Sequence, residues 1–218
     1  MADYILEFQD VWKSYKDGKK ELNALKGIDL ALKKNSLNII LGPSGSGKTT
    51  LATLAGLLDT PTKGRILIKG RSTFNLSKSE RSKIRRKEIG IIYQRDNLLP
   101  YLNVLENVML SMVSPNQHKC IKALEAAELT EIGKFPEELS IEKQQRVTLV
   151  RAMINDPLLI IADEPTGELD TQGTEIIMDL IKQTKNKSTV LLASNNVDLR
   201  EYGDEIFSLK ERKLEKTD

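Results

Sequence analysis

The chain has 218 residues, and its 33 lysines and arginines against 31 aspartates and glutamates give a formal net charge of +2. This length fits one large domain, and the balanced charge does not call for a polyanionic partner. The single cysteine, Cys120, excludes an intrachain disulfide and fits a reducing compartment.

The N-terminus and the apolar segments bear on the relation of the chain to membranes. Residues 1–4 contain no basic segment followed by an apolar one, so we expect no signal peptide. No apolar run approaches the ~18 residues that are needed to span a bilayer. We therefore expect any link to a membrane to come through a partner.

Hydrophobic patterning predicts strands that alternate with helices along most of the chain. Residues 4–15 and 22–32 alternate apolar and polar side chains, which is typical of antiparallel strands. The other expected strands are residues 37–41, 64–69, 89–93, 158–162, 189–193 and 205–209, the last of which closes the sheet. The expected helices are residues 49–57, 141–154, 171–184 and a stretch over 103–129 that is interrupted near Pro115. This alternation indicates a largely parallel α/β sheet.

The stretch from residue 98 to 139 has no expected strand and is typical of a helical insertion. We predict one domain over residues 1–218, with a core of residues 1–94 and 140–218 and a helical subdomain of residues 95–139. The basic cluster at residues 81–87 could bind nucleic acid or lipid headgroups, but such a run is more often the solvated face of a helix. We favour the solvated helix and expect no nucleic-acid partner.

Residues 42–49 read GPSGSGKT, which is the pattern of a phosphate-binding loop. Its glycines let the backbone curl so that successive N–H groups point at one anion. Lys48 supplies a charge for the outer phosphates, and Thr49 supplies a hydroxyl for Mg²⁺. A flexible Gly/Ser turn is the alternative, but this loop joins a buried strand to a helix whose N-terminus favours an anion. The predicted phosphate-binding residues are Gly42, Pro43, Ser44, Gly45, Ser46, Gly47, Lys48, Thr49 and Thr50.

Two acidic residues, Asp163 and Glu164, follow the apolar strand expected at residues 158–162. The carboxyl ends of parallel strands form the edge where α/β sheets bind ligands. Asp163 is suited to hold Mg²⁺ as a hard oxygen ligand, and Glu164 to polarise a water for attack on a terminal phosphate. A solvated pair of acids at the end of a strand is the alternative, and the nearby phosphate loop argues against it.

Three motifs together carry a resemblance to a known family. They are the phosphate loop, Gln94 after an apolar strand, and the run ADEPTGELD over residues 162–170. With them the chain resembles an ABC transporter ATP-binding subunit over nearly its whole length. Residues 97–100 (NLLP) and 104–108 (VLENV) are similar to the lipoprotein-releasing, macrolide-exporting and cell-division branch.

The resemblance implies a fold, cofactors and partners. The fold is a P-loop NTPase core of the RecA type with an antiparallel β subdomain and a helical insertion, and the cofactors are ATP and Mg²⁺. The partners are a transmembrane permease and a second ATP-binding subunit, which forms a homodimer or a heterodimer. The location is cytoplasmic, on the inner face of the cell membrane through the permease.

The resemblance also implies roles for single residues. Tyr15 occupies the position of an aromatic ring that stacks on adenine, although an ordinary strand aromatic is the alternative. Gln94 matches a glutamine that contacts Mg²⁺ and senses the membrane partner, and the metal ligands are then Thr49, Gln94 and Asp163. Asp170 matches an aspartate that contacts the opposite subunit. The helical insertion matches the subdomain that docks onto the membrane domain.

The chain departs from the family pattern in its signature segment. The family has Leu-Ser-Gly-Gly-Gln before a helix, and this chain has Leu139, Ser140, Ile141, Glu142 and Lys143. Ile141 adds bulk where the backbone approaches the γ-phosphate of the other subunit's ATP. Glu142 adds a charge that would repel a phosphate ~5 Å away by about 3 kcal/mol at an effective dielectric of ~20. In the first turn of a helix, Glu142 also suits the helix dipole.

The second departure follows the strand at residues 189–193. The family has a histidine that contacts the γ-phosphate, and this chain has Asn195. Asn195 can donate a hydrogen bond but cannot become cationic near neutral pH. The single histidine, His118, lies in the helical insertion and is expected to be a solvated helix residue.

Two functions fit these features. The first is an ATPase subunit that couples ATP binding and hydrolysis, which its departures from the family pattern would slow, to a membrane partner, with Glu164 activating the water. The second is a regulatory or structural subunit that binds ATP with little turnover. A soluble family member of DNA repair or translation is a third possibility, but those proteins carry long coiled coils or two linked cassettes, which this chain lacks.

Overall fold

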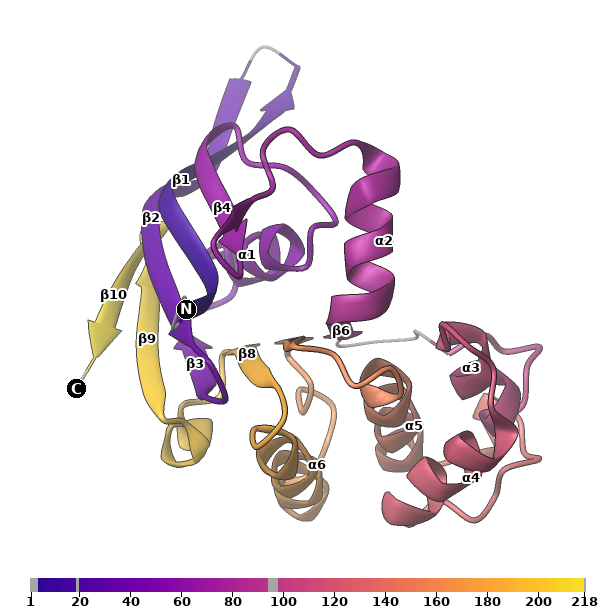
Figure 1. Cartoon of the computed structure of the whole chain (residues 1–218). Coiled ribbons are helices and arrows are strands. Elements are labelled where there is room, and N and C mark those ends of the chain that lie inside the picture. The colour runs from indigo at the N-terminus through magenta and orange to yellow at the C-terminus, as the bar shows by residue number, and fades with distance from the viewer. Residues whose placement is uncertain (1–3, 19, 94–97, 218) are drawn as a thin grey trace.

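The computed structural model describes residues 4–18, 20–93 and 98–217, which form two β-sheets with helices around them (Figure 1). The central sheet has six strands in the order β10-β9-β3-β8-β7-β6, and all neighbours except β10 and β9 are parallel. Its strands are β3 (Leu37–Leu41), β6 (Ile89–Ile92), β7 (Leu159–Asp163), β8 (Thr189–Ser194), β9 (Glu205–Lys210) and β10 (Lys213–Thr217). The predicted parallel α/β sheet is therefore present.

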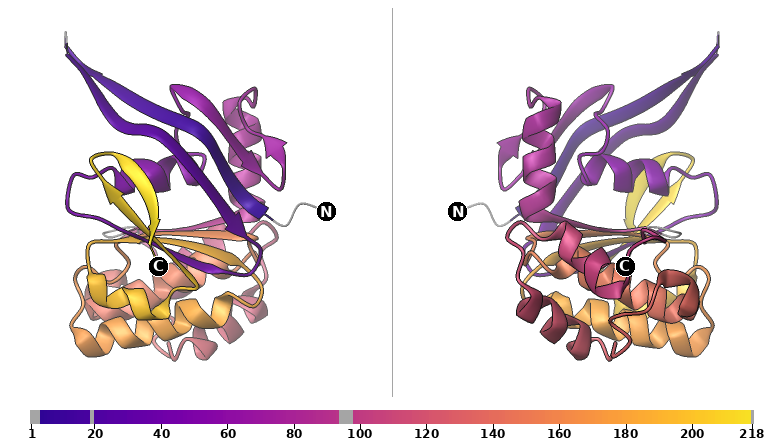
Figure 2. Two further views of the ribbon diagram at one scale, coloured as in Figure 1. Left: turned by 90° about the vertical axis from the view of Figure 1, so that its left-hand side faces the viewer. Right: turned by 90° about the vertical axis from the view of Figure 1, so that its right-hand side faces the viewer.

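The second sheet is antiparallel, with the order β2-β1-β4-β5. Its strands are β1 (Tyr4–Asp17), β2 (Lys20–Lys33), β4 (Lys63–Ile68) and β5 (Arg71–Ser72). β1 and β2 form a long hairpin that extends away from the central sheet (Figure 2). The alternating patterns at residues 4–15 and 22–32 correctly predicted antiparallel strands in these two segments.

Six α-helices complete the described part of the chain. α1 lies between the two sheets, and α5 and α6 cover the opposite face of the central sheet (Figures 1 and 2). The α-helices are α1 (Lys48–Ala55), α2 (Lys78–Glu88), α3 (Val104–Ser111), α4 (Gln117–Ala126), α5 (Ile141–Met153) and α6 (Thr171–Thr184). Two short 3-10 helices, η1 (Pro136–Glu138) and η2 (Val197–Tyr202), lie in the connections. None of the described helices combines the length and apolar character that crossing a bilayer requires.

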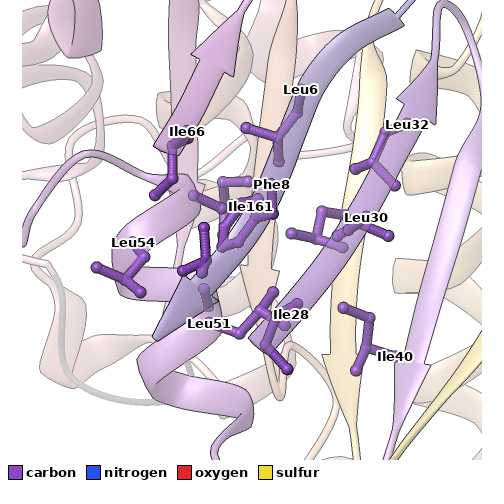
Figure 3. Packing of buried hydrophobic residues seen from close by; sticks show 14 of the residues in the cluster. Leu6, Phe8, Ile28, Leu30, Leu32, Ile40, Leu51, Leu54, Ile66 and Ile161 are labelled. Carbon is purple, nitrogen blue, oxygen red and sulfur yellow. The ribbon is translucent and has the colours of Figure 1, made fainter. Parts of the chain in front are cut away.

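The apolar runs in the central strands divide between two cores, because successive side chains of a strand point to opposite faces. Ile40, Ile161 and Leu191 face the antiparallel sheet and α1. Figure 3 shows this side, where Phe8 of β1 and Leu51 of α1 pack together with Ile161. Their neighbours in sequence face α5 and α6, namely Ile39, Ile160, Ala162, Val190 and Leu192. Burial on both faces explains why these strands are continuously apolar.

The helical segment after residue 98 has a core of its own. α3, α4 and α5 bury a cluster that includes Val108, Cys120, Leu124 and Val147. α3 ends at Ser111 and Asn116 caps the start of α4, so the helical pattern is interrupted around Pro115, as the sequence predicts. Burial raises the pKa of the Cys120 thiol, which leaves this cysteine a packed and unreactive group.

The structure differs from the expected elements chiefly at one edge of the central sheet and after the phosphate loop. Residues 205–209 form β9 as predicted but do not close the sheet, because the hairpin partner β10 lies outside it. β10 escaped prediction because its exposed sequence, KLEKT, has little hydrophobic pattern. The helix after the phosphate loop is α1, which ends at Ala55 before Leu57 takes a left-handed conformation. The basic cluster belongs to α2, which buries none of its residues, in agreement with the predicted solvated helix.

Candidate nucleotide-binding site

The phosphate loop joins β3 to α1 at the carboxyl edge of the central sheet. Two of its glycines are required by their surroundings. A Cβ atom on Gly42 would lie 2.4 Å from the carbonyl oxygen of Leu209, and one on Gly47 would lie 2.6 Å from that of Ala24. Gly47 also has a φ of 111°, which disfavours any other residue, and α1 begins directly after it. The loop backbone thus packs closely against β9 at Gly42 and against β2 at Gly47.

Lys48 is buried at the centre of this loop. Its Nζ donates hydrogen bonds to the carbonyl oxygens of Gly42 (2.8 Å) and Pro43 (3.2 Å). The same Nζ forms an ion pair with Glu164 Oε1 at 3.2 Å. The side chains of Lys48 and Glu164 are only 6% and 12% exposed, so solvent screens this pair little. A phosphate that binds Lys48 will compete with the Glu164 carboxylate for the same ammonium.

Glu164 is held by contacts on both of its carboxylate oxygens. Oε2 accepts hydrogen bonds from Ser194 Oγ (3.0 Å) and from the backbone N–H of Asn195 (3.1 Å). Its own N–H donates to Ala193 O at 2.8 Å, and its φ is 49°. This left-handed conformation is uncommon outside glycine and lets the chain turn sharply at the end of β7. The carboxylate therefore lies between the ends of β7 and β8, beside the phosphate loop.

Asp163 carries a partly buried carboxylate that lacks a full set of partners. Thr49 shares a side-chain hydrogen bond with it, but among the described residues the buried Oδ1 atom has no hydrogen-bond partner. Burial raises the pKa of this carboxyl, the bond to Thr49 opposes the rise, and the Glu164 charge adds to it. A divalent cation fits this environment, since it would neutralise the charge and use oxygen ligands from Asp163 and Thr49. Gln94, the third predicted ligand, lies outside the described residues.

Asp163→Asn is expected to stabilise the metal-free fold. The raised pKa means that ionised Asp163 destabilises the folded chain, fully so above its folded-state pKa, and that the effect disappears as the pH falls below the ordinary value. At pH 7 we expect a higher thermal midpoint, by about 2–4 °C for each kcal/mol gained. Differential scanning calorimetry in the presence of EDTA measures this midpoint. Asp179→Asn, which changes an exposed carboxylate on α6, is the control. A midpoint at or below that of the parent would contradict the argument.

A cavity of about 390 Å³ joins the phosphate loop to the antiparallel sheet. Tyr15, of which 40% is exposed, lines one part, and Lys48, Glu164 and Asn195 line another. The remaining lining residues are Leu22, Ala24, Ser44, Gly45, Gly47, Thr49, Thr50 and Arg212. The structure thus brings Tyr15, most of the loop, Glu164 and Asn195 to one cavity. Ser46 is the loop residue between Gly45 and Gly47, and its buried Oγ has no hydrogen-bond partner among the described residues.

None of the predicted signature residues is among the described residues that line this cavity. Ser140 caps α5, where its Oγ accepts a hydrogen bond from the N–H of Lys143 (3.3 Å). Ile141 is 56% exposed at the start of that helix. Asp170 is exposed and caps α6 through the N–H of Gly173 (2.8 Å). These three residues therefore lie at the N-termini of α5 and α6, outside the lining of the cavity at the phosphate loop.

The charge of Glu142 is already paired. Its Oε1 contacts Arg146 Nε one helical turn away, and Arg146 also reaches Glu128 Oε2 at 3.2 Å. The repulsion estimated for a free carboxylate thus overstates the effect of Glu142, because the guanidinium, which Glu128 shares, offsets part of its field. The spacing of four residues on one helix was visible in the sequence and could have indicated this pair.

Three other features of the site were missed or differ from expectation. Asn195 holds Glu164 through its backbone N–H, a contact that no side-chain pattern reveals. Ser194 contributes a hydroxyl to Glu164 although sequence reasoning assigned it no role. Arg212 reaches the cavity from the turn between β9 and β10, which the sequence did not predict. His118 is exposed on α4, as expected.

Comparison with known proteins places these features in a family. A family profile described as ABC transporter matches residues 25–167. The uncharacterised ABC transporter ATP-binding protein MJ1508 of Methanocaldococcus jannaschii is 37% identical over 218 residues, covering 96% of this chain and 97% of that protein. The lipoprotein-releasing system ATP-binding protein LolD of Hyphomonas neptunium is 37% identical over 223 residues, covering 98% of each.

Solved structures show the same fold. The ATP-binding cassette MJ0796 of Methanocaldococcus jannaschii, described as dimeric and bound to ADP and Pi after hydrolysis, has a TM-score of 0.90 at 35% identity, covering 97% of this chain and 98% of that one. The cbiO1 protein of Clostridium perfringens, described as part of the transporter complex cbiONQ, has a TM-score of 0.85 at 29% identity, covering 98% and 88%. The α/β P-loop NTPase fold is confirmed, and the chain belongs to the ABC transporter family as an ATP-binding ATPase subunit.

Proposed function

We propose that this subunit binds Mg-ATP in the cavity between Tyr15 and the phosphate loop and hydrolyses it to drive a membrane partner. One observation carries the proposal: Lys48, Thr49, Asp163 and Glu164 converge at the sheet edge around a buried carboxylate oxygen that lacks a hydrogen-bond partner among the described residues. Lys48 would bind the outer phosphates, and Thr49, Asp163 and Gln94 would hold Mg²⁺. The metal would neutralise phosphate charge and orient the γ-phosphate.

In this proposal Glu164 is the general base. Its carboxylate is fixed by Ser194 and by the backbone of Asn195, which favours an orientation toward a water at the γ-phosphate. A regulatory subunit with little turnover is the alternative. Hydrolysis is favoured because the chain has Glu164 at the position of the general base and because two hydrogen bonds hold its carboxylate. Asn195 would donate an amide hydrogen bond where the family uses a histidine.

The dimer and the membrane partner are also proposed. Ser140, Ile141, Glu142 and Asp170 would face the ATP of a second subunit, in a homodimer or a heterodimer, as the dimeric relative MJ0796 suggests. The residues 95–139 would form the helical subdomain within one domain of residues 1–218. A groove between α2 and α3, lined by exposed Leu110 and by the partly buried Arg85 and the exposed Arg86, suits a partly acidic segment of a permease on the cytoplasmic side of the membrane.

Phosphate release by the purified chain tests the proposed ATPase activity. The same assay measures how much the departures from the family pattern lower the rate of hydrolysis. The variant Ile141→Gly, Glu142→Gly, Asn195→His should hydrolyse Mg-ATP about tenfold faster or more, because backbone N–H groups and an imidazole then reach the γ-phosphate. ATP-dependent dimerisation, followed by light scattering, should rise in parallel. EDTA should abolish turnover in every variant.

Two single substitutions separate the effect of side-chain bulk from the effect of charge in this variant. Because Arg146 already pairs with Glu142, Glu142→Gln alone should change turnover by less than about twofold. Ile141→Gly alone should give a larger share of the gain. If the triple variant neither dimerises nor hydrolyses ATP better than the parent, the departures do not limit this subunit. Absence of Mg-dependent turnover in all variants would favour the regulatory alternative.

A further inference from the structure

A buried lysine lies directly beside the ring that lines the cavity. Lys13 and Tyr15 are two residues apart on β1, so their side chains share one face of the sheet. Lys13 is only 9% exposed, and its Nζ lies 4.9 Å from the centroid of the Tyr15 ring. Lysines are rarely buried to this extent, and the distance is within the range of a cation–π contact.

Asp59 fixes both side chains in place. Lys13 Nζ forms an ion pair with Asp59 Oδ2 at 2.7 Å and donates to Thr60 O at 2.9 Å. The hydroxyl of Tyr15 donates to the same Asp59 Oδ2 at 3.3 Å. Burial tends to raise the pKa of Asp59, but the hydrogen bond from Lys13 and the Thr60 N–H outweigh it and leave the pKa below its usual value. A buried ammonium therefore has its counter-charge, and that counter-charge also holds the tyrosine.

This arrangement connects the Tyr15 ring to the phosphate loop. Asp59 follows α1, the helix that starts at the loop, and precedes β4. The same connection is bound to β1 at Thr62, whose N–H donates to Trp12 O (2.8 Å) and whose Oγ1 accepts from the N–H of Ser14 (3.0 Å). The segment that follows α1 is thus bound to the part of β1 that carries Tyr15.

We propose that Lys13 and Asp59 are positioning residues for the base of the nucleotide, acting through Tyr15. Tyr15 lines the cavity and, among the described residues, Lys13 does not, so the cation lies against the ring but outside the lining of the cavity. A cation on one face draws electron density from the ring and strengthens stacking of a base on the other face. A ring that is already fixed loses less side-chain entropy when the base binds. This inference rests on the proposed function of Tyr15.

The test compares a ligand that has a base with one that does not. Calorimetry measures the affinity of the full chain for ATP and for inorganic tripolyphosphate, both with Mg²⁺. Lys13→Met keeps the length of the side chain and removes the charge, and it should weaken ATP binding about three- to tenfold. Tripolyphosphate binding should change by less than about twofold. Lys13→Arg should retain most of the ATP affinity, which a role in packing alone would not produce.

Two controls separate the inference from general effects. Lys63→Met removes another lysine above a ring, 6.0 Å from the centroid of Trp12, and should leave both affinities unchanged. In a Tyr15→Ala background, Lys13→Met should have no further effect on ATP, because the two residues act as a unit. Equal losses for ATP and tripolyphosphate in Lys13→Met, or no loss for ATP, would overturn the proposal.

The Tyr15 variants distinguish failure of the positioning role of Lys13 and Asp59 from failure of the proposed function. If Tyr15→Ala binds ATP as tightly as the parent, the base does not stack on Tyr15 and the site assignment itself is wrong. If Tyr15→Ala weakens ATP but Lys13→Met does not, only the positioning role fails. Should Lys13→Met not fold, Tyr15→Phe removes only the hydroxyl bound to Asp59 and should weaken ATP about twofold, with tripolyphosphate unchanged. Unchanged ATP binding in Tyr15→Phe would then count against the role of Asp59.

Discussion

Lys48→Met is expected to weaken the binding of Mg-ATP about 10- to 100-fold. Lys48 is buried, and a hydrogen bond to a charged group contributes about 1.5–3 kcal/mol, which corresponds to losses of this size. Methionine keeps most of the side-chain volume but cannot bind a phosphate. Isothermal titration calorimetry with ATP and Mg²⁺ gives the affinity directly.

The control for Lys48 is Lys34→Met, which removes an exposed lysine from the turn before β3 and should leave ATP affinity unchanged. Because Lys48 also pairs with Glu164, its loss leaves a buried carboxylate without its cation and should lower the thermal midpoint. Circular dichroism must therefore show a folded Lys48→Met variant at the temperature of the titration. Equal ATP affinity in the folded variant and the parent would disprove the phosphate site.

Glu164→Gln is expected to lower the rate of ATP hydrolysis about 10²- to 10⁴-fold, which is the usual contribution of a general base. Glutamine has the size of glutamate and can still accept the N–H of Asn195, so the geometry at the ends of β7 and β8 should be preserved. It no longer competes for Lys48 as a carboxylate does. ATP affinity should therefore be equal to that of the parent or higher.

Steady-state phosphate release and calorimetry on the same preparation test both parts. Glu175→Gln, an exposed carboxylate on α6, is the matched control and should leave the rate unchanged. If the rate of Glu164→Gln equals that of an active parent, Glu164 is not the base. If ATP affinity falls sharply, the ion pair with Lys48 does not compete with phosphate in the way that the geometry indicates.

Local patterns in the sequence were enough to predict most of the fold. The apolar strand at residues 158–162 and the interruption of the helical pattern near Pro115 depend on side-chain periodicity and on residues next to each other in the chain. β10 has five mostly polar residues, and its place at the sheet edge depends on pairing with β9 rather than on burial. Short polar edge strands give little signal of this kind.

The candidate site was predictable in its residues but not in its contacts. The loop at residues 42–49 and the acids Asp163 and Glu164 are recognisable because each has a chemical role at a fixed spacing. Their contacts depend on the tertiary fold: Lys48 pairs with Glu164, and the backbone of Asn195 holds the same carboxylate. Asp59 and Tyr15, 44 residues apart, are brought together only by the fold.

The position of β3 determines when the phosphate loop can be assembled during synthesis. The loop is encoded early, but the strand before it has both of its neighbours, β8 and β9, near the other end of the sequence. The buried side chain of Asn38 in β3 donates to Val190 O, 152 residues later. Contacts this distant close slowly and require the intervening chain. A nascent chain on the ribosome therefore carries a complete phosphate-loop sequence before the sheet that positions the loop can form. That sheet forms only after β8 and β9 have emerged from the exit tunnel.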